Sequence, residues 1–159
     1  MPEPAARRGT VLAFDFGVKR IGVAVGELET KQAHPLATIR EERNDRRFAA
    51  IAALVGEWRP ALLVVGRPVA LDGSAHAMTR LCERFAGRLR ARFGIEVAPA
   101  EERLTSAEAE ERLRDSGYNT RFARRHVDAL AAQIILQSYL DRLPETQMES
   151  CHASTAHAA

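Results

Sequence analysis

The sequence predicts one α/β domain built on a mixed five-stranded sheet that is flanked by helices. Residues 11–14 and 61–65 form continuous apolar runs, which are typical of strands covered on both faces. The first three predicted strands are too close in sequence for crossover connections, so they must pair antiparallel. Each of the two later strands follows a predicted helix and can therefore join the sheet in parallel.

The first two strands are predicted to form a hairpin. The run 11–14 is too short for a buried helix, and Gly17 permits a sharp turn soon after it. An alternating apolar pattern then indicates the second strand, and residues 35–39 are predicted as a short third strand. The alternating residues are Ile21, Val23 and Val25.

Two helices enclose the fourth strand, residues 61–65. The first helix begins near Asp45 and is stopped by Pro60, because proline cannot continue a helix. The loop 66–74 follows the strand, and Ser74 is expected to cap the second helix, which ends at Gly94. The supporting apolar positions are Phe48, Ile51, Ala52, Val55 and Trp58 in the first helix, and Met78, Leu81, Cys82, Phe85, Leu89 and Phe93 in the second.

The fifth strand is predicted at residues 95–97, and Pro99 indicates that it lies at a sheet edge. Thr105 or Ser106 is expected to cap a short helix that ends near residue 114. A final helix is predicted over residues 124–143. Its expected buried stripe consists of Val127, Leu130, Ala131, Ile134 and Ile135.

These elements give a single domain over residues 1–143, with a loose arm at 1–8 and a disordered polar tail at 144–159. The formal net charge of the 159 residues is only +2, which neither requires nor excludes a nucleic-acid partner. Cys82 and Cys151 show no disulfide or zinc spacing. No signal peptide or membrane-length apolar run is visible, so we expect a cytoplasmic protein without a membrane partner.

Three acidic residues stand out by their surroundings. Asp15 ends the first strand, Glu102 follows the predicted last strand, and Asp128 lies near the start of the final helix. If that helix packs over the strand ends, the three carboxylates meet at one rim. Their mutual repulsion would be relieved by one or two divalent cations, Mg²⁺ or Mn²⁺, which can promote phosphodiester hydrolysis.

Each acid also has an ordinary structural interpretation. Asp15 can cap a turn, Glu102 can pair with Arg103, and Asp128 can favour a helix N-terminus. Taken singly, these interpretations are at least as probable as a catalytic role.

Four sequence blocks in the same order resemble the YqgF/RuvX family, a branch of the RNase H-like superfamily. They are residues 12–26, residues 64–74, residues 101–106 and residues 127–132, and the resemblance spans residues 10–142. It implies an RNase H-like fold and an acidic, metal-binding catalytic triad of Asp15, Glu102 and Asp128. It also implies a cytoplasmic nuclease that trims the 16S ribosomal RNA precursor, or a Holliday junction resolvase. Family members usually have Asp where Glu101 stands, and an apolar residue where Arg67 stands.

Basic side chains adjoin all three acids in sequence, which predicts contacts to a phosphate backbone. The predicted nucleic-acid-binding residues are Lys19, Arg20, Arg67, Arg103, Arg124 and Arg125. A second row, Arg80, Arg84, Arg88 and Arg92, is more often a solvated helix face.

Three functions compete at this point. The first is a metal-dependent nuclease acting on structured RNA, such as precursor rRNA, or on branched DNA. The second is a nucleic-acid-binding factor in ribosome assembly or transcription with little catalysis. The third is a sugar-kinase or actin-like ATPase, because the sequence from Asp15 to Gly22 resembles their first phosphate loop. Those enzymes clasp ATP between two domains, and this chain has room for one.

Overall fold

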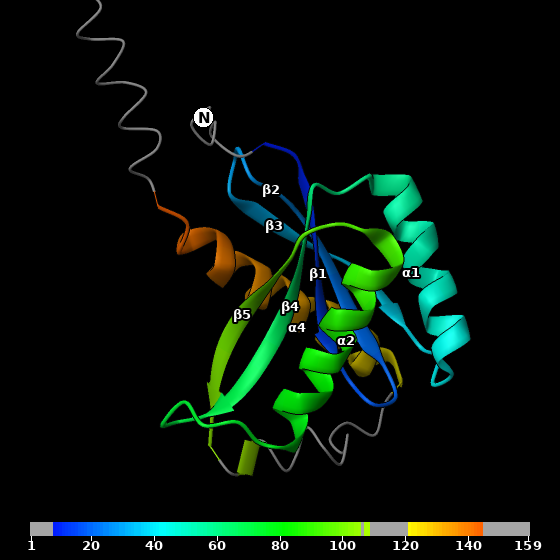
Figure 1. The fold of residues 1–159 in the computed structure, drawn as a ribbon. Helices are drawn as coiled ribbons and strands as arrows, with labels where there is room; N and C mark the ends of the chain where they lie inside the picture. Colours follow the sequence, from blue (N-terminus) through cyan, green and yellow to red (C-terminus); the bar gives the residue numbers. More distant parts are fainter. Residues whose placement is uncertain (1–7, 106, 109–120, 145–159) are drawn as a thin grey trace, which may run out of the picture.

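The computed structural model describes residues 8–105, 107–108 and 121–144, and the side chains of residues 121–127 are outside this description. The elements are β1 (Thr10–Phe16), β2 (Ile21–Glu27), β3 (Gln32–Ile39), α1 (Asn44–Trp58), β4 (Leu62–Ala70), α2 (Ala77–Phe93), β5 (Val97–Leu104) and α4 (Arg121–Asp141) (Figure 1). No helix in this described part is long and apolar enough to cross a membrane.

The five strands form one sheet in the order β3-β2-β1-β4-β5. The pairs β1–β2 and β2–β3 are antiparallel, whereas β1–β4 and β4–β5 are parallel. This confirms the predicted mixed sheet, which is consistent with an RNase H-like fold. It also confirms that β5, which contains Pro99, is an edge strand.

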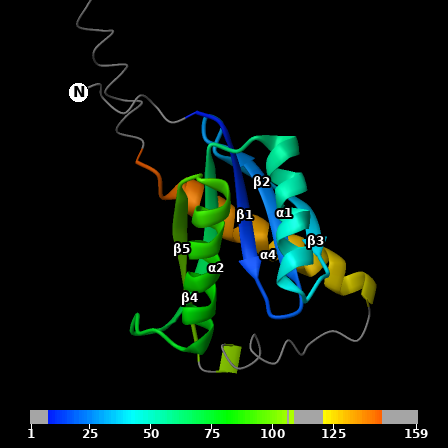
Figure 2. The ribbon, with the colours of Figure 1, turned by 45° about the vertical axis from the view of Figure 1, so that its right-hand side comes forward.

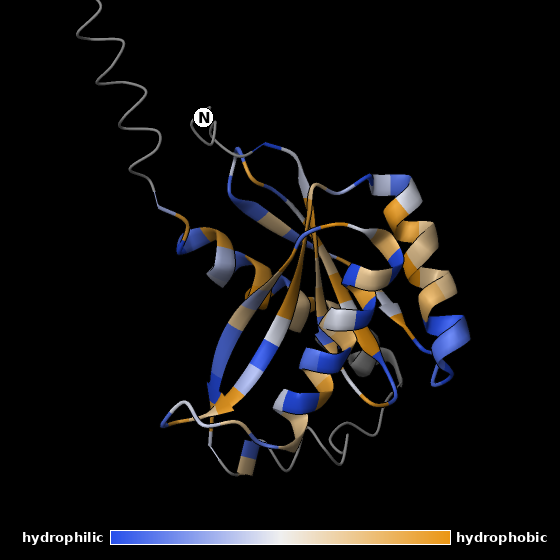
Figure 3. Cartoon of the chain, viewed as in Figure 1, coloured by the Kyte–Doolittle hydropathy of each residue, from blue (hydrophilic) through white to orange (hydrophobic). Residues whose placement is uncertain are grey.

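The sheet lies between two helical layers. Helices α1 and α2 cover one face, and α4 runs across the other face (Figure 2). Even-numbered residues of β1 point toward α1 and α2, and odd-numbered residues point toward α4. In Figure 3, hydrophobic residues gather where the strands cross behind α1 and α2, while hydrophilic residues mark the second half of β5.

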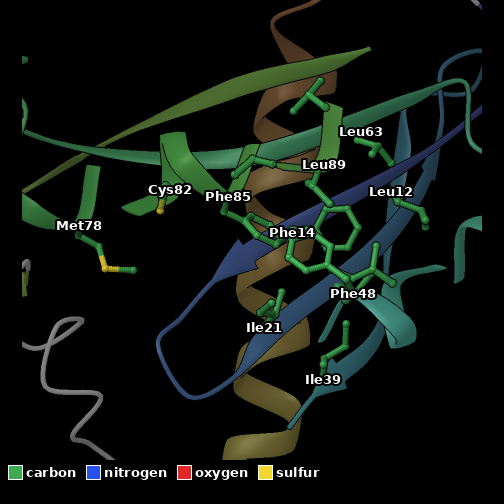
Figure 4. Packing of buried hydrophobic residues seen from close by; sticks show 14 residues of the cluster. Leu12, Phe14, Ile21, Ile39, Phe48, Leu63, Met78, Cys82, Phe85 and Leu89 are labelled. Carbon is green, nitrogen blue, oxygen red and sulfur yellow. The ribbon is translucent and has the colours of Figure 1, made fainter. Parts of the chain in front are cut away.

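Large side chains fill the core between the sheet and α1 and α2, and Figure 4 shows them. The Phe85 ring of α2 is central, since its centroid lies 5.9 Å from that of Phe14, 4.9 Å from that of Phe16 and 5.9 Å from that of Phe48. Burying several aromatic rings in contact supplies a large part of the hydrophobic stabilisation of a domain this size.

The face under α4 is lined by smaller residues. Its buried cluster includes Ala13, Ala24, Ala33, Ala100 and Ala132, together with larger Val, Ile and Leu side chains. Gly26 also lies against this helix, because an added Cβ would meet Leu136 at 3.0 Å and Leu140 at 3.3 Å. Small sheet residues therefore let α4 approach the strands closely.

Strands β4 and β5 are both longer than the sequence predicted. Residues 67–70 of β4 pair with residues 101–104 of β5, so the prediction of a loop over 66–74 is wrong in its first half. The prediction that β5 ends at residue 97 is also wrong. Proline, glycine and charges look like loop residues in sequence, but a strand with an unpaired side tolerates them. β5 is an edge strand, and residues 66–70 of β4 extend past the last residue that pairs with β1. Glu102 therefore lies within β5 rather than after it.

Two details of the helices were also predicted wrongly. The α2 cap is His76, whose Nδ1 accepts from the Met78 amide at 3.2 Å, whereas Ser74 forms a turn with Asp72. In α4, Leu130 and Ile134 are 44% and 68% exposed. Ile135 is buried as predicted, and the other buried residues of α4 are Ala129, Ala132, Leu136 and Leu140.

Other expectations are partly outside the described residues. Thr105 and Glu108 form the reciprocal hydrogen bonds of a helix cap, as predicted for Thr105, but most of the short helix lies outside the described residues. The same holds for residues 1–7 of the N-terminal arm and for the tail from residue 145.

Candidate active site

Asp15 lies at the end of the central strand, on the face covered by α4. Val11 and Ala13 belong to the cluster under α4, so the period of two along a strand places Asp15 on the same face. Its antiparallel partner is Gly22 of β2, and the Asp15 side chain is half-buried. The carboxylate thus stands beside a position that has no side chain.

Asp128 approaches the sheet at this same gap. A Cβ atom built on Gly22 would lie 2.0 Å from the backbone oxygen of Asp128 and 2.5 Å from its carbonyl carbon. Only glycine therefore permits this contact between β2 and α4. Because Gly22 pairs with Asp15, the close approach brings Asp128 next to the end of β1. Asp128 is one and a half to two turns into α4 rather than near its start, since the helix begins at Arg121.

Glu102 reaches the same face from the edge strand. Alternation along β5 puts Glu102 on the side of Ala98 and Ala100, which pack under α4. Its Oε1 lies 3.2 Å from the position that a Cβ on Gly66 would occupy. Gly66 directly follows Val65, the β4 partner of Phe14, so it lies beside the end of β1. A missing side chain in β4 thus leaves space for the Glu102 carboxylate.

The three predicted acids therefore share one face and one end of the sheet. Among the described residues, however, no group of three or more His, Cys, Asp or Glu side chains is arranged to hold a single metal ion. Carboxylate oxygens are the donors that Mg²⁺ prefers, and this ion can keep several waters, so the donor chemistry fits while the carboxylates are not gathered.

Arg20 forms an ion pair with one of the three acids, Asp128. Its Nε donates to Oδ2 of Asp128 at 2.8 Å, and the two side chains are only 15% and 21% exposed. A charge-assisted bond at this depth is little screened by solvent. Arg20 thus lies at the site, where it fixes the Asp128 carboxylate in this conformation, and its role in binding nucleic acid stays a prediction.

Arg47 of α1 holds the loop that carries Arg20, and no function was predicted for it from the sequence. This residue is 3% exposed, and its guanidinium donates to the backbone oxygens of Gly17, Val18 and Glu41. It also lies over the Phe16 ring, 5.3 Å from the centroid. Burial lowers the pKa of Arg47 from its ordinary value. The sequence feature that could have indicated its burial is the spacing: Arg47 lies four residues before Ile51, so both share the buried face of the helix.

The other predicted cations lie in different places. Lys19 is exposed beside Arg20. Arg103 donates to the backbone oxygen of Leu71 at 2.8 Å. Arg67 points to the α2 face, where it bonds Glu83 at 2.9 Å and Glu101 at 2.8 Å, so the structure does not bring Arg67 or Glu101 together with the three acids. The side chains of Arg124 and Arg125 lie outside the described residues.

The Arg row of α2 is exposed at all four positions, as the sequence predicted for a solvated face. Arg92 covers the Phe48 ring at 4.5 Å from its centroid, a contact that shields the core edge. The row lies on the opposite side of the sheet from α4 (Figure 2). It is therefore not part of the acidic site.

A family model described as "RuvX: Holliday junction resolvase" matches residues 9–142. Similar proteins bear the name "Putative pre-16S rRNA nuclease". The one from Methylobacillus flagellatus is 57% identical over 90% of this chain and 99% of its own length. The one from Dechloromonas aromatica is 56% identical over 84% and 91%, and the one from Burkholderia lata is 46% identical over 91% and 97%. The resemblance seen in the four sequence blocks is confirmed, and the chain belongs to the RuvX family.

Proposed function

We propose that the protein is a metal-dependent nuclease that hydrolyses phosphodiester bonds in the 16S rRNA precursor, at its 5′ end, in the cytoplasm. The observation that carries this proposal is the placement of Asp15, Glu102 and Asp128 on one face at one end of the sheet. The names of the similar proteins support the substrate.

In this proposal the three acids hold one or two Mg²⁺ or Mn²⁺ ions, which supply an activated water and neutralise charge on the phosphate. Asp15 and Glu102 present carboxylates from rigid strands, so little ordering is needed when the substrate binds. Asp128 could join them through Oδ1 while Oδ2 keeps its bond to Arg20, or through Oδ2 by exchanging that bond. Arg20 and Lys19 then lie beside the site, where they can bind a phosphate oxygen.

The test is cleavage of a precursor transcript by wild type and by Asp15→Asn, with Mg²⁺ or Mn²⁺ present. We expect Asp15→Asn to lose at least about 100-fold in rate, because even outer-shell partners of a metal cost about 10–100-fold. Binding of the transcript should persist, since it rests on cations. Asp141→Asn, an exposed acid on α4, is the matched control and should cleave normally. Equal rates for wild type and Asp15→Asn would refute the nuclease proposal.

The family description gives a second candidate substrate, a four-way DNA junction. Incubating the same proteins with such a junction separates the two. Faster cleavage of the junction than of the transcript would replace RNA by branched DNA as the substrate. If neither substrate is cleaved in the presence of metal, the protein is better explained as a binding factor with little catalysis.

A further inference from the structure

A groove runs along the edge of the sheet, beside the candidate active site. Its volume is about 470 Å³, and it lies between β5 and the second half of α4. One wall is the end of β5, including Glu102 and Arg103. The other is a row at four-residue spacing, Ile134 and Ser138 on α4 and Arg142 directly after it. Glu102 therefore belongs both to the acidic site and to the groove.

Two features of the α4 wall are unusual for a surface without a ligand. Ile134 is 68% exposed, although the chain buries most of its other large aliphatic residues. Arg142 is exposed, and no carboxylate of the described residues forms an ion pair with it. An apolar side chain and a cation thus stand two turns apart on one open wall.

The charge balance of the groove favours an anion. Glu101 at its rim is neutralised by Arg67, at 2.8 Å. By the alternation along β5, Arg103 points to the same side as Glu101 and donates to the Leu71 oxygen at 2.8 Å. The charges left to the groove are therefore Arg142 against Glu102, and the proposed function assigns Glu102 to a metal. Phosphate is an anion that an exposed arginine binds well.

We propose that this groove binds a single-stranded segment of the nucleic-acid substrate, next to the scissile bond. The inference rests on the proposed nuclease function. Arg142 would bind a phosphate, Ser138 would donate a hydrogen bond to the backbone, and Ile134 would pack against a base or sugar. A single strand exposes base faces together with phosphates, whereas a duplex hides its base faces, so the mixed wall fits the single strand.

The test measures binding, without catalysis, to a fluorescein-labelled single-stranded RNA and to a blunt RNA duplex. Fluorescence anisotropy is recorded in EDTA at several salt concentrations. Arg142→Ala should raise the Kd for the single strand about tenfold and reduce the salt slope by about 0.7, the value for one phosphate contact on a single strand. The duplex Kd should stay within about twofold. Arg46→Ala is the control, because Arg46 is an exposed arginine of α1, and its Kd for both RNAs should match that of wild type.

A gain-of-binding variant guards against trivial loss of fold. Ser138→Lys adds a cation to the same wall and should lower the Kd for the single strand. Unchanged binding of the single strand by Arg142→Ala would overturn the proposal, and equal weakening for both RNAs would overturn the single-strand assignment. Because cleavage is absent from this assay, its failure is distinguishable from that of the nuclease proposal, which Asp15→Asn decides.

Discussion

The face of the sheet under α1 and α2 is filled by large side chains, whereas the face under α4 has many small ones. Phe14, Phe48 and Phe85 meet on the first face. Gly22 and Gly66 lie on the second, where Asp128 and Glu102 come close to the strands. The first face stabilises the domain, and the second uses missing side chains to place polar groups near the central strand.

The two faces also treat charge differently. Arg47 is buried near the first face, and its charge is satisfied by three backbone oxygens that hold the loop before β2. The carboxylates of the second face are half-buried and can reach solvent or a ligand. A closed network fixes the loop, while an open one leaves groups available for chemistry.

The largest effect on stability is expected on the first face. Phe85→Ala should lower the free energy of unfolding by about 3–5 kcal/mol, because it removes a buried ring and leaves a cavity. Urea denaturation measures this loss. Cleavage per folded molecule should be nearly unchanged at low temperature, since Phe85 packs on the α1–α2 face and the three acids lie on the other face. If activity fell while the protein stayed folded, the assignment of stability to the α1–α2 face and of catalysis to the α4 face would be wrong.

Arg47→Met should come next, with a loss of about 1–3 kcal/mol, because the oxygens of Gly17 and Val18 lose a charged donor. Cleavage should fall as well, since the loop that carries Arg20 is released. Arg43→Met is the control, because Arg43 is an exposed arginine at the N-terminus of the same helix. An Arg47→Met protein with wild-type stability in urea would show that the buried guanidinium does not hold the loop.

Gly22→Ala should cost about 1–3 kcal/mol, the usual penalty of overpacking. The added Cβ would push Asp128 and α4 away from β2, because the clash is with backbone rather than with a flexible side chain. The cleavage rate should therefore fall by more than the loss of folded protein accounts for. Activity and stability that both match wild type would rule out the close contact.

Gly56→Ala gives the smallest change and the opposite sign. Gly56 lies in α1, and nothing occupies the space of an added Cβ within 4 Å. Alanine should stabilise the protein by about 0.4–1 kcal/mol through helix propensity and reduced chain entropy. A decrease in melting temperature would show that Gly56, like Gly22, does not accept an added Cβ without cost.

The sheet topology was predictable because strand spacing and crossover rules allow few arrangements. Strand ends were less predictable: Pro68 suggested a loop and the fifth strand was predicted to end at residue 97, yet the pairing of β4 with β5 carries Pro68 and residues 98–104 within strands. Leu130 and Ile134 fit a helical stripe by spacing, but α4 turns Ala132 and Leu136 toward the sheet instead. Periodicity alone cannot choose between neighbouring stripes when one contains small residues.

The candidate acids were selected from sequence by their surroundings: Asp15 at the end of a buried strand, where a charge is unusual, Glu102 after the predicted last strand, and Asp128 beside the apolar stripe of the final helix. The contacts around them in the folded protein were not predicted. The Arg20–Asp128 bond joins residues 108 positions apart, and the buried role of Arg47 depends on where the loop of residues 17–20 lies. Such contacts follow from tertiary packing, which local patterns do not encode.

The most direct test of the account compares two neighbouring residues of β5. Glu102 faces α4 and the acids, whereas Glu101 faces α2 and pairs with Arg67. Cleavage of the precursor transcript with Mg²⁺ should fall at least about 100-fold in Glu102→Gln, as expected for a metal ligand. It should stay near the wild-type rate in Glu101→Gln. Normal cleavage by Glu102→Gln, or equal loss in both variants, would contradict a catalytic site on the α4 face.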